Sequence, residues 1–348
     1  MSAQVAPPAA LPNLLPKFAK PVPMSPPLTE FDPAYLARKA EIGPERIFKL
    51  KSGRQFSYFT EGREEDTAVL CLPGTGRGNL EMIPQKPLPG LFIIAVDSMG
   101  HGESSPLEKN LGLSVAVEEM LELLDHLKVK QFYLCGHSRG GVIAANIAAA
   151  APERVLGIAL IGTPCDIHHK NVTDAVAKSM KTFKTIFGGK GCYASSLRTF
   201  LKNTNFKNMW YHKDKSKDFG FAGHKTGGYK FYISKALGGA PEKNNTDHFF
   251  VSQCLDAELH GCNSPWSTWY FFSQIYEAAW PFDVADIKCR CHIYQESINQ
   301  AMALQNHELI AGSEMTLWDQ HGHLSIIMEF EKIVLGLVEG KIVKEGFQ

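Results

Sequence analysis

Residues 131–150 read QFYLCGHSRGGVIAANIAAA, and this stretch decides the fold. Its apolar first part, Gln131 to Cys135, predicts a strand, and its alanine-rich end, Gly141 to Ala150, predicts a helix. The turn between them, Gly136 to Gly140, has glycine at both ends, which lets a strand and a helix approach closely without side-chain clashes. The central Ser138 is therefore expected in a strained bend at a helix N-terminus, where backbone N–H groups favour developing negative charge.

Four motifs, in this order along the chain, resemble those of the α/β-hydrolase superfamily. Residues 68–76 are similar to its buried strand and glycine loop, with Pro73 in place of the usual histidine. Residues 92–105, FIIAVDSMGHGESS, resemble its strand and Asp-x-x-Gly-x-Gly-x-Ser loop, and 136–155 resemble its nucleophile turn and following helix. Gly322-His323 follows an expected strand and precedes an apolar helix, where the family keeps its catalytic histidine. The resemblance implies an α/β-hydrolase fold.

Strand and helix patterns along the chain predict the same architecture. Apolar runs with little alternation are typical of strands covered on both faces of a mostly parallel sheet. Expected helices at 114–128 and 141–150 alternate with these strands, which predicts right-handed crossovers. Because ligands in such sheets meet the carboxyl ends of the strands, Ser138, Thr75 and His323 are expected together there. The expected strands are 47–50, 54–60, 68–72, 91–97, 131–135, 156–161, 289–295 and 315–318.

Composition divides the chain into three parts. At 348 residues the chain is longer than a usual single domain, so one core plus an insertion is expected. Residues 1–44 hold 10 of the 20 prolines and are assigned to a Pro-rich, disordered leader. Residues 45–163 and 281–348 are assigned to the core. Residues 164–280 lie between two core strands, and their position and length resemble the family's mainly helical cap, or lid.

The expected cap carries an excess of positive charge. It contains 15 Lys and Arg against 9 Asp and Glu, in a chain whose formal net charge is zero. We interpret its Lys-rich part, 178–230, as a solvated helical surface, with a mouth that attracts anionic substrates or lipid headgroups as the alternative. The aromatic side chains within 266–280 are expected to form the cap core, with some facing Ser138.

Composition also gives expectations for the protein's location, binding partners and cofactors. The neutral charge balance gives no indication of nucleic-acid binding, and the eight cysteines contain no Cys-x-x-Cys pair that would suggest a metal. We therefore expect packing thiols, no metal or organic cofactor and a reducing, cytoplasmic location. No stretch approaches the ~20 apolar residues of a membrane span. Organelle targeting by the leader stays open, because Lys17 and Lys20 precede its first acid, Glu30.

The resemblance assigns the chemistry to a serine and a histidine. Ser138 is the expected nucleophile, and His323 is the expected base, with His321 as a weaker competitor. Gly74, Thr75 and Arg139 are expected to bind substrate, and the backbone amides of Thr75 and Arg139 to form an oxyanion hole.

The third member of the expected triad departs from the family. An aspartate usually follows the strand at 291–295, and Asn299 stands at that point. Asparagine can orient an imidazole by a hydrogen bond but cannot stabilise an imidazolium with charge. Asn299 is our predicted third residue, and Glu296 or Asp166 in its place stays open, as does a loss of hydrolysis.

Together these features predict a cap-bearing hydrolase that cleaves a carboxylic ester or related acyl substrate through an acyl-enzyme on Ser138. The expected partner is a small acyl or ester molecule, lipid-like or anionic in the alternative reading of the cap. Two other functions stay open: a ligand-binding protein that has lost hydrolysis, and a lyase that uses the same serine and histidine as acid and base.

Overall fold

The computed structural model describes the central sheet together with the helices packed on it. The described residues are 31–106, 111–176, 248–261, 274–276, 278–296, 300–318, 321, 323 and 325–344. Most of the segment assigned to the cap, including the Lys-rich part and most of the aromatic cluster, lies outside them, as do residues 1–30 and Asn299.

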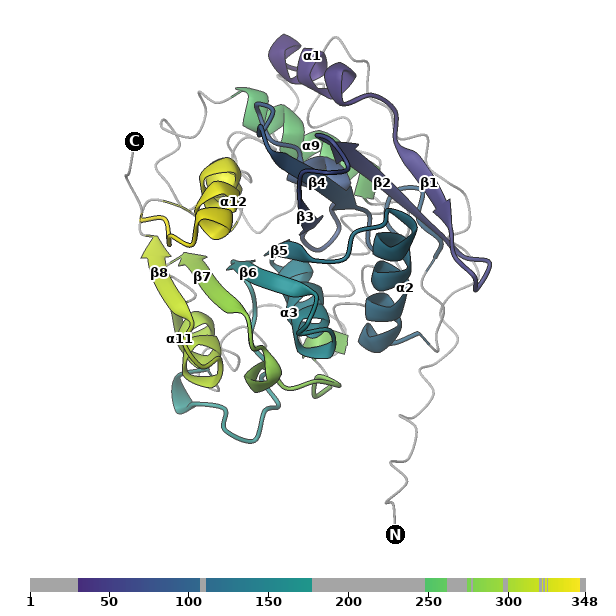
Figure 1. Ribbon diagram of the computed structural model, residues 1–348. Coiled ribbons are helices and arrows are strands. Elements are labelled where there is room, and N and C mark those ends of the chain that lie inside the picture. The colour runs from purple at the N-terminus through teal and green to yellow at the C-terminus, as the bar shows by residue number, and fades with distance from the viewer. Residues whose placement is uncertain are drawn as a thin grey trace, which may run out of the picture.

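An eight-stranded sheet runs through the molecule in the order β1-β2-β4-β3-β5-β6-β7-β8 (Figure 1). β1 pairs with β2 and β2 with β4 antiparallel, and the remaining neighbours are parallel. The predicted strands are confirmed to within two residues. Their bounds are β1 Arg46–Lys49, β2 Gln55–Glu61, β3 Thr67–Leu72, β4 Leu91–Val96, β5 Phe132–His137, β6 Val155–Ile161, β7 Arg290–Glu296 and β8 Glu314–Trp318.

Helices cover both faces of this sheet (Figure 1). Leu70 and Leu72 of β3 pack in one apolar cluster with residues of α2 (Leu113–His126), α3 (Arg139–Ala150) and α11 (Gln300–Leu309). Val69 and Cys71 pack in a second cluster with α1 (Pro33–Ile42), α9 (His248–Gly261) and α12 (Phe330–Glu339). Because successive strand residues point to opposite faces, both faces of β3 are apolar and the predicted double covering is confirmed.

Helix α1 corrects the sequence interpretation of residues 31–44 as part of a disordered leader. The Asp32 carboxylate accepts hydrogen bonds from the N–H groups of Ala34 and Tyr35, and Pro33 opens the helix. Proline suits that position because its missing N–H has no helical partner there. Tyr35 is fully buried, and its hydroxyl donates to Asp256 of α9 at 2.7 Å. Pro33 therefore opens an ordered helix and does not belong to a disordered leader.

Helix α9, from the segment assigned to the cap, is attached to the loop that follows β3. This loop contains the short helix η2 (Asn79–Met82). The Gln253 amide donates to the carbonyls of Leu80 at 3.1 Å and Ile83 at 2.7 Å, and the Gly78 N–H donates to the carbonyl of Ala257 at 2.9 Å. α9 therefore fixes the path of the loop. No helix among the residues just described is long and apolar enough to cross a membrane.

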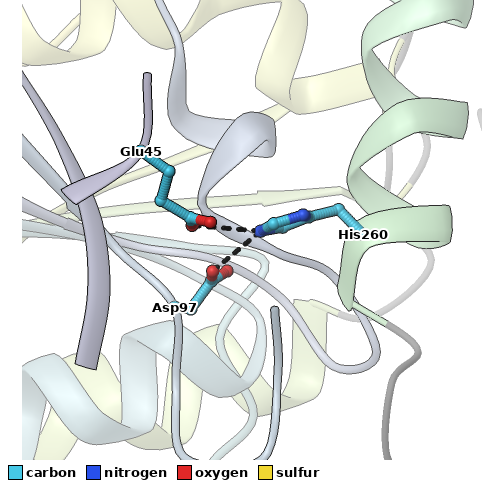
Figure 2. Close-up of side chains that lie close together, drawn as sticks. All are labelled: Glu45, Asp97 and His260. Carbon is cyan, nitrogen blue, oxygen red and sulfur yellow. Dashed lines mark hydrogen bonds and ion pairs between the residues drawn. The ribbon is translucent and has the colours of Figure 1, made fainter. Parts of the chain in front are cut away.

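A cluster of one imidazole and two carboxylates fastens the end of α9 to the core (Figure 2). His260 Nε2 lies 2.8 Å from Asp97, which follows β4, and 3.2 Å from Glu45, which precedes β1. Burial lowers the pKa of His260, but hydrogen bonds and charge from Asp97 and Glu45 outweigh it and raise the pKa to about 10. His260 is therefore an imidazolium at neutral pH, and this ion pairing joins three separate segments of the chain.

This cluster predicts that the stability conferred by His260 depends on pH. Since folding raises its pKa, the contribution is fully present below the unfolded pKa of about 6.5 and is lost as the pH rises toward about 10. The melting temperature of the wild type should exceed that of His260→Gln most near pH ~6.5, and the difference should shrink toward pH ~10. Calorimetry of both proteins across this range measures it. A difference that stays constant with pH would show that the imidazolium contributes nothing to stability.

Candidate functional site

The strained serine predicted from the sequence is present between β5 and α3. Ser138 has a φ of 52° and a ψ of −119°, a backbone conformation that a non-glycine residue adopts only where its surroundings impose it. Its N–H donates to the carbonyl of Ile161 at 2.7 Å, and α3 begins at the next residue. The hydroxyl thus lies at a helix N-terminus, at the carboxyl end of the parallel strands.

Glycines on either side of the serine allow this bend. A Cβ at Gly140 would lie 2.1 Å from the carbonyl oxygen of Leu72, and one at Gly136 would lie 2.5 Å from the carbonyl oxygen of Gly140. Both neighbours are backbone atoms, so neither can move aside as a flexible side chain would. Gly140 therefore lets the start of α3 pack directly on the end of β3, and Gly136 lets it pack on the end of β5.

Ser138, His323 and Glu296 form a continuous hydrogen-bonded chain. His323 Nε2 lies 3.0 Å from Ser138 Oγ, and His323 Nδ1 lies 3.0 Å from Glu296 Oε1. Since a carboxylate only accepts, Nδ1 carries the hydrogen and Nε2 is free to accept the hydroxyl proton of the serine. This tautomer is the one that a general base needs.

Glu296 occupies the position on the imidazole for which the sequence analysis favoured Asn299. It is the last residue of β7, fully buried, and its second oxygen accepts from the Gln295 amide at 2.9 Å. Asn299 lies outside the described residues. Asp166, the other alternative, accepts instead from the N–H groups of His168 and Trp280. The carboxylate on His323 thus comes from the strand itself and not from the loop after it.

The charge of Glu296 alters the imidazole that it contacts. Burial lowers the pKa of His323, but the charge and hydrogen bond of Glu296, with a smaller contribution from Glu81, outweigh this and raise the pKa above its usual value. Gly162 makes room for the pair, because a Cβ there would lie 3.1 Å from two atoms of the His323 ring. The imidazole is therefore a stronger base than a free histidine and lies next to the hydroxyl.

Gly74 and Arg139, both expected to bind substrate, are in contact. The Arg139 guanidinium donates to the carbonyl of Gly74 at 2.9 Å and to Nε2 of His101 at 3.0 Å, while His101 Nδ1 faces the carbonyl of Met99 at 3.0 Å. Burial lowers the pKa of His101, and the neighbouring Arg139 lowers it further, so the ring is neutral and accepts from the guanidinium. The Arg139 side chain thus holds the loop that carries Thr75, which leaves the backbone amides of Thr75 and Arg139 as the oxyanion-hole candidates.

Glu81 is a site residue that the sequence analysis missed. It lies on η2, is almost fully buried, and contacts Gly74, Arg77 and His137. No sequence motif marks it: Gly74 and Arg77 lie in its own loop, and His137 comes from the distant end of β5. His321, the weaker candidate for the base, lies beside Trp318 and 4.0 Å from Glu329.

Potential metal-ligand atoms gather at one place among the described residues, the cluster of Glu45, Asp97 and His260 in Figure 2. Their facing atoms already hydrogen-bond to one another and to the Asn79 amide, which donates to Glu45 at 2.6 Å and to Asp97 at 3.0 Å. The positive charge of the His260 imidazolium between two carboxylates accounts for this arrangement without a metal ion. The cysteines with described positions are free thiols.

Comparison with known proteins agrees with this fold. Residues 67–190 match the family model for the alpha/beta hydrolase fold. The enol-lactonase from Burkholderia xenovorans superimposes with a TM-score of 0.59 over 84% of this chain and 100% of that chain, at 15% sequence identity. The chain has an α/β-hydrolase fold.

Curated relatives of this α/β-hydrolase-fold chain match a little over a third of its length. It is 34% identical over 128 residues to the dihydrolipoyllysine-residue acetyltransferase component of the acetoin cleaving system of Pseudomonas putida, covering 36% of this chain and 32% of that protein. It is 32% identical over 139 residues to bifunctional epoxide hydrolase 2 of Sus scrofa, covering 38% of this chain and 25% of that protein. The match thus spans about a third or less of each of these two relatives.

The close packing at Gly140 yields a stability prediction for this fold. Gly140→Ala should destabilise the protein by about 1–3 kcal/mol or more, because the added methyl group overlaps the backbone of Leu72 and Pro73. Urea unfolding measures the change. Gly112→Ala is the matched control, since a Cβ there meets no atom within 4 Å. Equal unfolding midpoints for the two variants would contradict the packing argument.

Proposed function

We propose that this protein is a serine hydrolase that cleaves a carboxylic ester or related acyl substrate. The observation that carries the proposal is the chain of 3.0 Å contacts from Ser138 through His323 to Glu296, at the N-terminus of α3. A serine hydroxyl is a weak nucleophile until a base accepts its proton, and an oriented imidazole beside it supplies that base. A small acyl or ester molecule is the proposed substrate, and a cytoplasmic location remains a prediction from composition.

Each residue has a defined role in the proposed reaction. Ser138 Oγ attacks the carbonyl carbon while its proton moves to His323 Nε2, and Glu296 stabilises the imidazolium that forms. The backbone amides of Thr75 and Arg139 stabilise the oxyanion. His323 then gives the proton to the leaving oxygen, which departs and leaves an acyl-enzyme. A water molecule, deprotonated by the same imidazole, hydrolyses the ester of Ser138.

The carboxylate on His323 favours hydrolysis over a ligand-binding role. In the sequence analysis, a loss of hydrolysis stayed open because the uncharged Asn299 stands where the family has an aspartate. Glu296 removes that argument, because a buried carboxylate beside the imidazole is the element that a binding protein would not need. The substrate-binding cap proposed for residues 164–280 and the identity of the acyl group remain proposals.

The first functional prediction concerns the nucleophile. Wild-type protein should be labelled covalently by a fluorophosphonate, which traps an activated serine, and Ser138→Ala should abolish labelling without loss of folding. Mass spectrometry of the labelled protein measures the site, and circular dichroism checks the fold. A lyase or hydrolase that uses Ser138 as proposed reacts, whereas a ligand-binding protein does not. Labelling of Ser138→Ala at the wild-type rate would refute the assignment.

The second functional prediction separates Glu296 from Asn299. Glu296→Gln should lower kcat by roughly 10⁴, the loss seen when the corresponding acid of a serine-histidine-aspartate triad becomes an amide. Asn299→Ala should retain most activity, since Glu296 already holds Nδ1 of His323. Steady-state kinetics on p-nitrophenyl esters of graded chain length measures both variants. The reverse ranking would identify Asn299 as the third residue.

A further inference from the structure

Glu81 connects segments that the proposed reaction needs to keep aligned. Its Oε2 accepts from the Gly74 N–H at 2.6 Å, and its Oε1 lies 3.1 Å from both Arg77 Nη1 and His137 Nδ1. Glu81 and His137 are each 1% exposed, so water does not compete for these contacts. Burial raises the pKa of Glu81, but His137, Arg77 and the Gly74 N–H outweigh it and lower the pKa to about 2. The carboxyl group is therefore ionised.

His137 contacts both Glu81 and the backbone of His323, the proposed base. Its Nδ1 faces Glu81, and its Nε2 lies 2.8 Å from the backbone carbonyl of His323. Both facing atoms are acceptors, so both contacts are hydrogen bonds only when each ring nitrogen carries a hydrogen. His137 therefore links the carboxylate of Glu81 to the backbone of His323 through its two ring nitrogens.

Three loops meet in this network. Gly74 belongs to the expected oxyanion loop, His137 directly precedes the nucleophile Ser138, and the His323 carbonyl belongs to the loop of the base. These residues are closely packed, because a Cβ at Gly74 would lie 3.0 Å from His137 Nδ1 and 3.4 Å from Glu81 Oε2. One carboxylate therefore sets the spacing among an oxyanion-hole amide, the nucleophile and the base.

We propose that Glu81, acting through His137, is a positioning residue that aligns the oxyanion loop, Ser138 and His323 for acyl transfer. The inference rests on the proposed serine hydrolase function. Glu81 touches neither substrate nor the reacting atoms, so its effect on catalysis comes from geometry and from its charge near His323. Only a carboxylate suits this position, since all three partners are donors and a glutamine would direct amide hydrogens at one of them.

Two substitutions of Glu81 separate the effect of its side-chain length from the effect of its charge. Glu81→Gln keeps the length of the side chain and removes the charge, whereas Glu81→Asp keeps the charge and shortens the side chain by one methylene. Glu119→Gln is the matched control, because Glu119 is also a buried carboxylate paired with an arginine, Arg54, but lies on α2. Its substitution should lower stability without changing catalysis.

The readouts are kcat, KM and the pH dependence of kcat/KM on a p-nitrophenyl ester. Glu81→Gln should lower kcat roughly 10²-fold with little change in KM, the loss expected when groups near the reaction are misplaced by about 1 Å. The acidic limb of the kcat/KM pH profile of Glu81→Gln should also move to lower pH. The reason is that His323 loses a nearby negative charge, and that charge raises the pKa of His323. Glu81→Asp should lower kcat while the limb stays near the wild-type position.

A spectroscopic measurement tests the network without any variant. In ¹⁵N-histidine-labelled wild-type protein, Nδ1 of His137 should carry a hydrogen that is bonded to Glu81, since a carboxylate only accepts. An Nδ1 without a hydrogen would overturn the proposal, also in the case where Glu81→Gln does not fold. A folded Glu81→Gln with wild-type kcat and an unshifted acidic limb would overturn it as well.

Failure of the positioning role is distinguishable from failure of the proposed function. If the wild type reacts with the fluorophosphonate at Ser138 and Glu81→Gln reacts at the same rate, only the role of Glu81 is refuted. If the wild type does not react at all, the serine hydrolase function is refuted, and with it the positioning role that depends on it.

Discussion

The architecture of the site depends on the direct backbone contact between the start of α3 and the end of β3. At Gly140 the helix lies so close to Leu72 that a single methyl group would overlap a carbonyl oxygen. Beside this contact Ser138 has its positive φ and directly precedes the first residue of α3. The contact also brings the loop after β3 close to the start of α3, so that Gly74 and Arg139 can touch. A larger residue than glycine at this point would displace both the bend at Ser138 and the loop after β3.

Buried charge organises the surroundings of that contact. Glu81, Glu296 and Arg139 are almost completely buried, and removing such groups from water is costly unless each charge is paired or fully hydrogen-bonded. Here every carboxylate faces donors: Glu296 faces His323 and Gln295, while Glu81 faces Gly74, Arg77 and His137. These pairs contribute defined geometry, because a buried ion pair is stable only when its partners are correctly placed. The carboxylates thereby fix loops whose own sequences impose no regular structure.

Helix α9, from the segment assigned to the cap, is anchored at the same place. α9 holds the loop after β3 through Gln253 and Ala257, and its last turn ends in the ion pairs of His260 (Figure 2). Helix α1 packs against α9 in turn, through Tyr35 and Asp256. A segment inserted after β6 and a segment before β1 therefore both support η2, the element that carries Glu81.

Local sequence determined the strands of the sheet and the turn at Ser138. Apolar runs predicted all eight strands, and the glycines around Ser138 predicted the strained turn, because strand periodicity and glycine chemistry act between near neighbours in the chain. Local composition gave a wrong prediction where a contact between distant residues stabilises a helix. Pro33 was assigned to a disordered leader, yet it opens a helix that α9 buries. Tertiary structure alone decided which acid faces His323, since β7 carries Glu296 to the imidazole while Asp166 is held by Trp280. It alone revealed the role of Glu81, because its partner His137 lies 56 positions away in the sequence and reaches it only when the sheet is assembled.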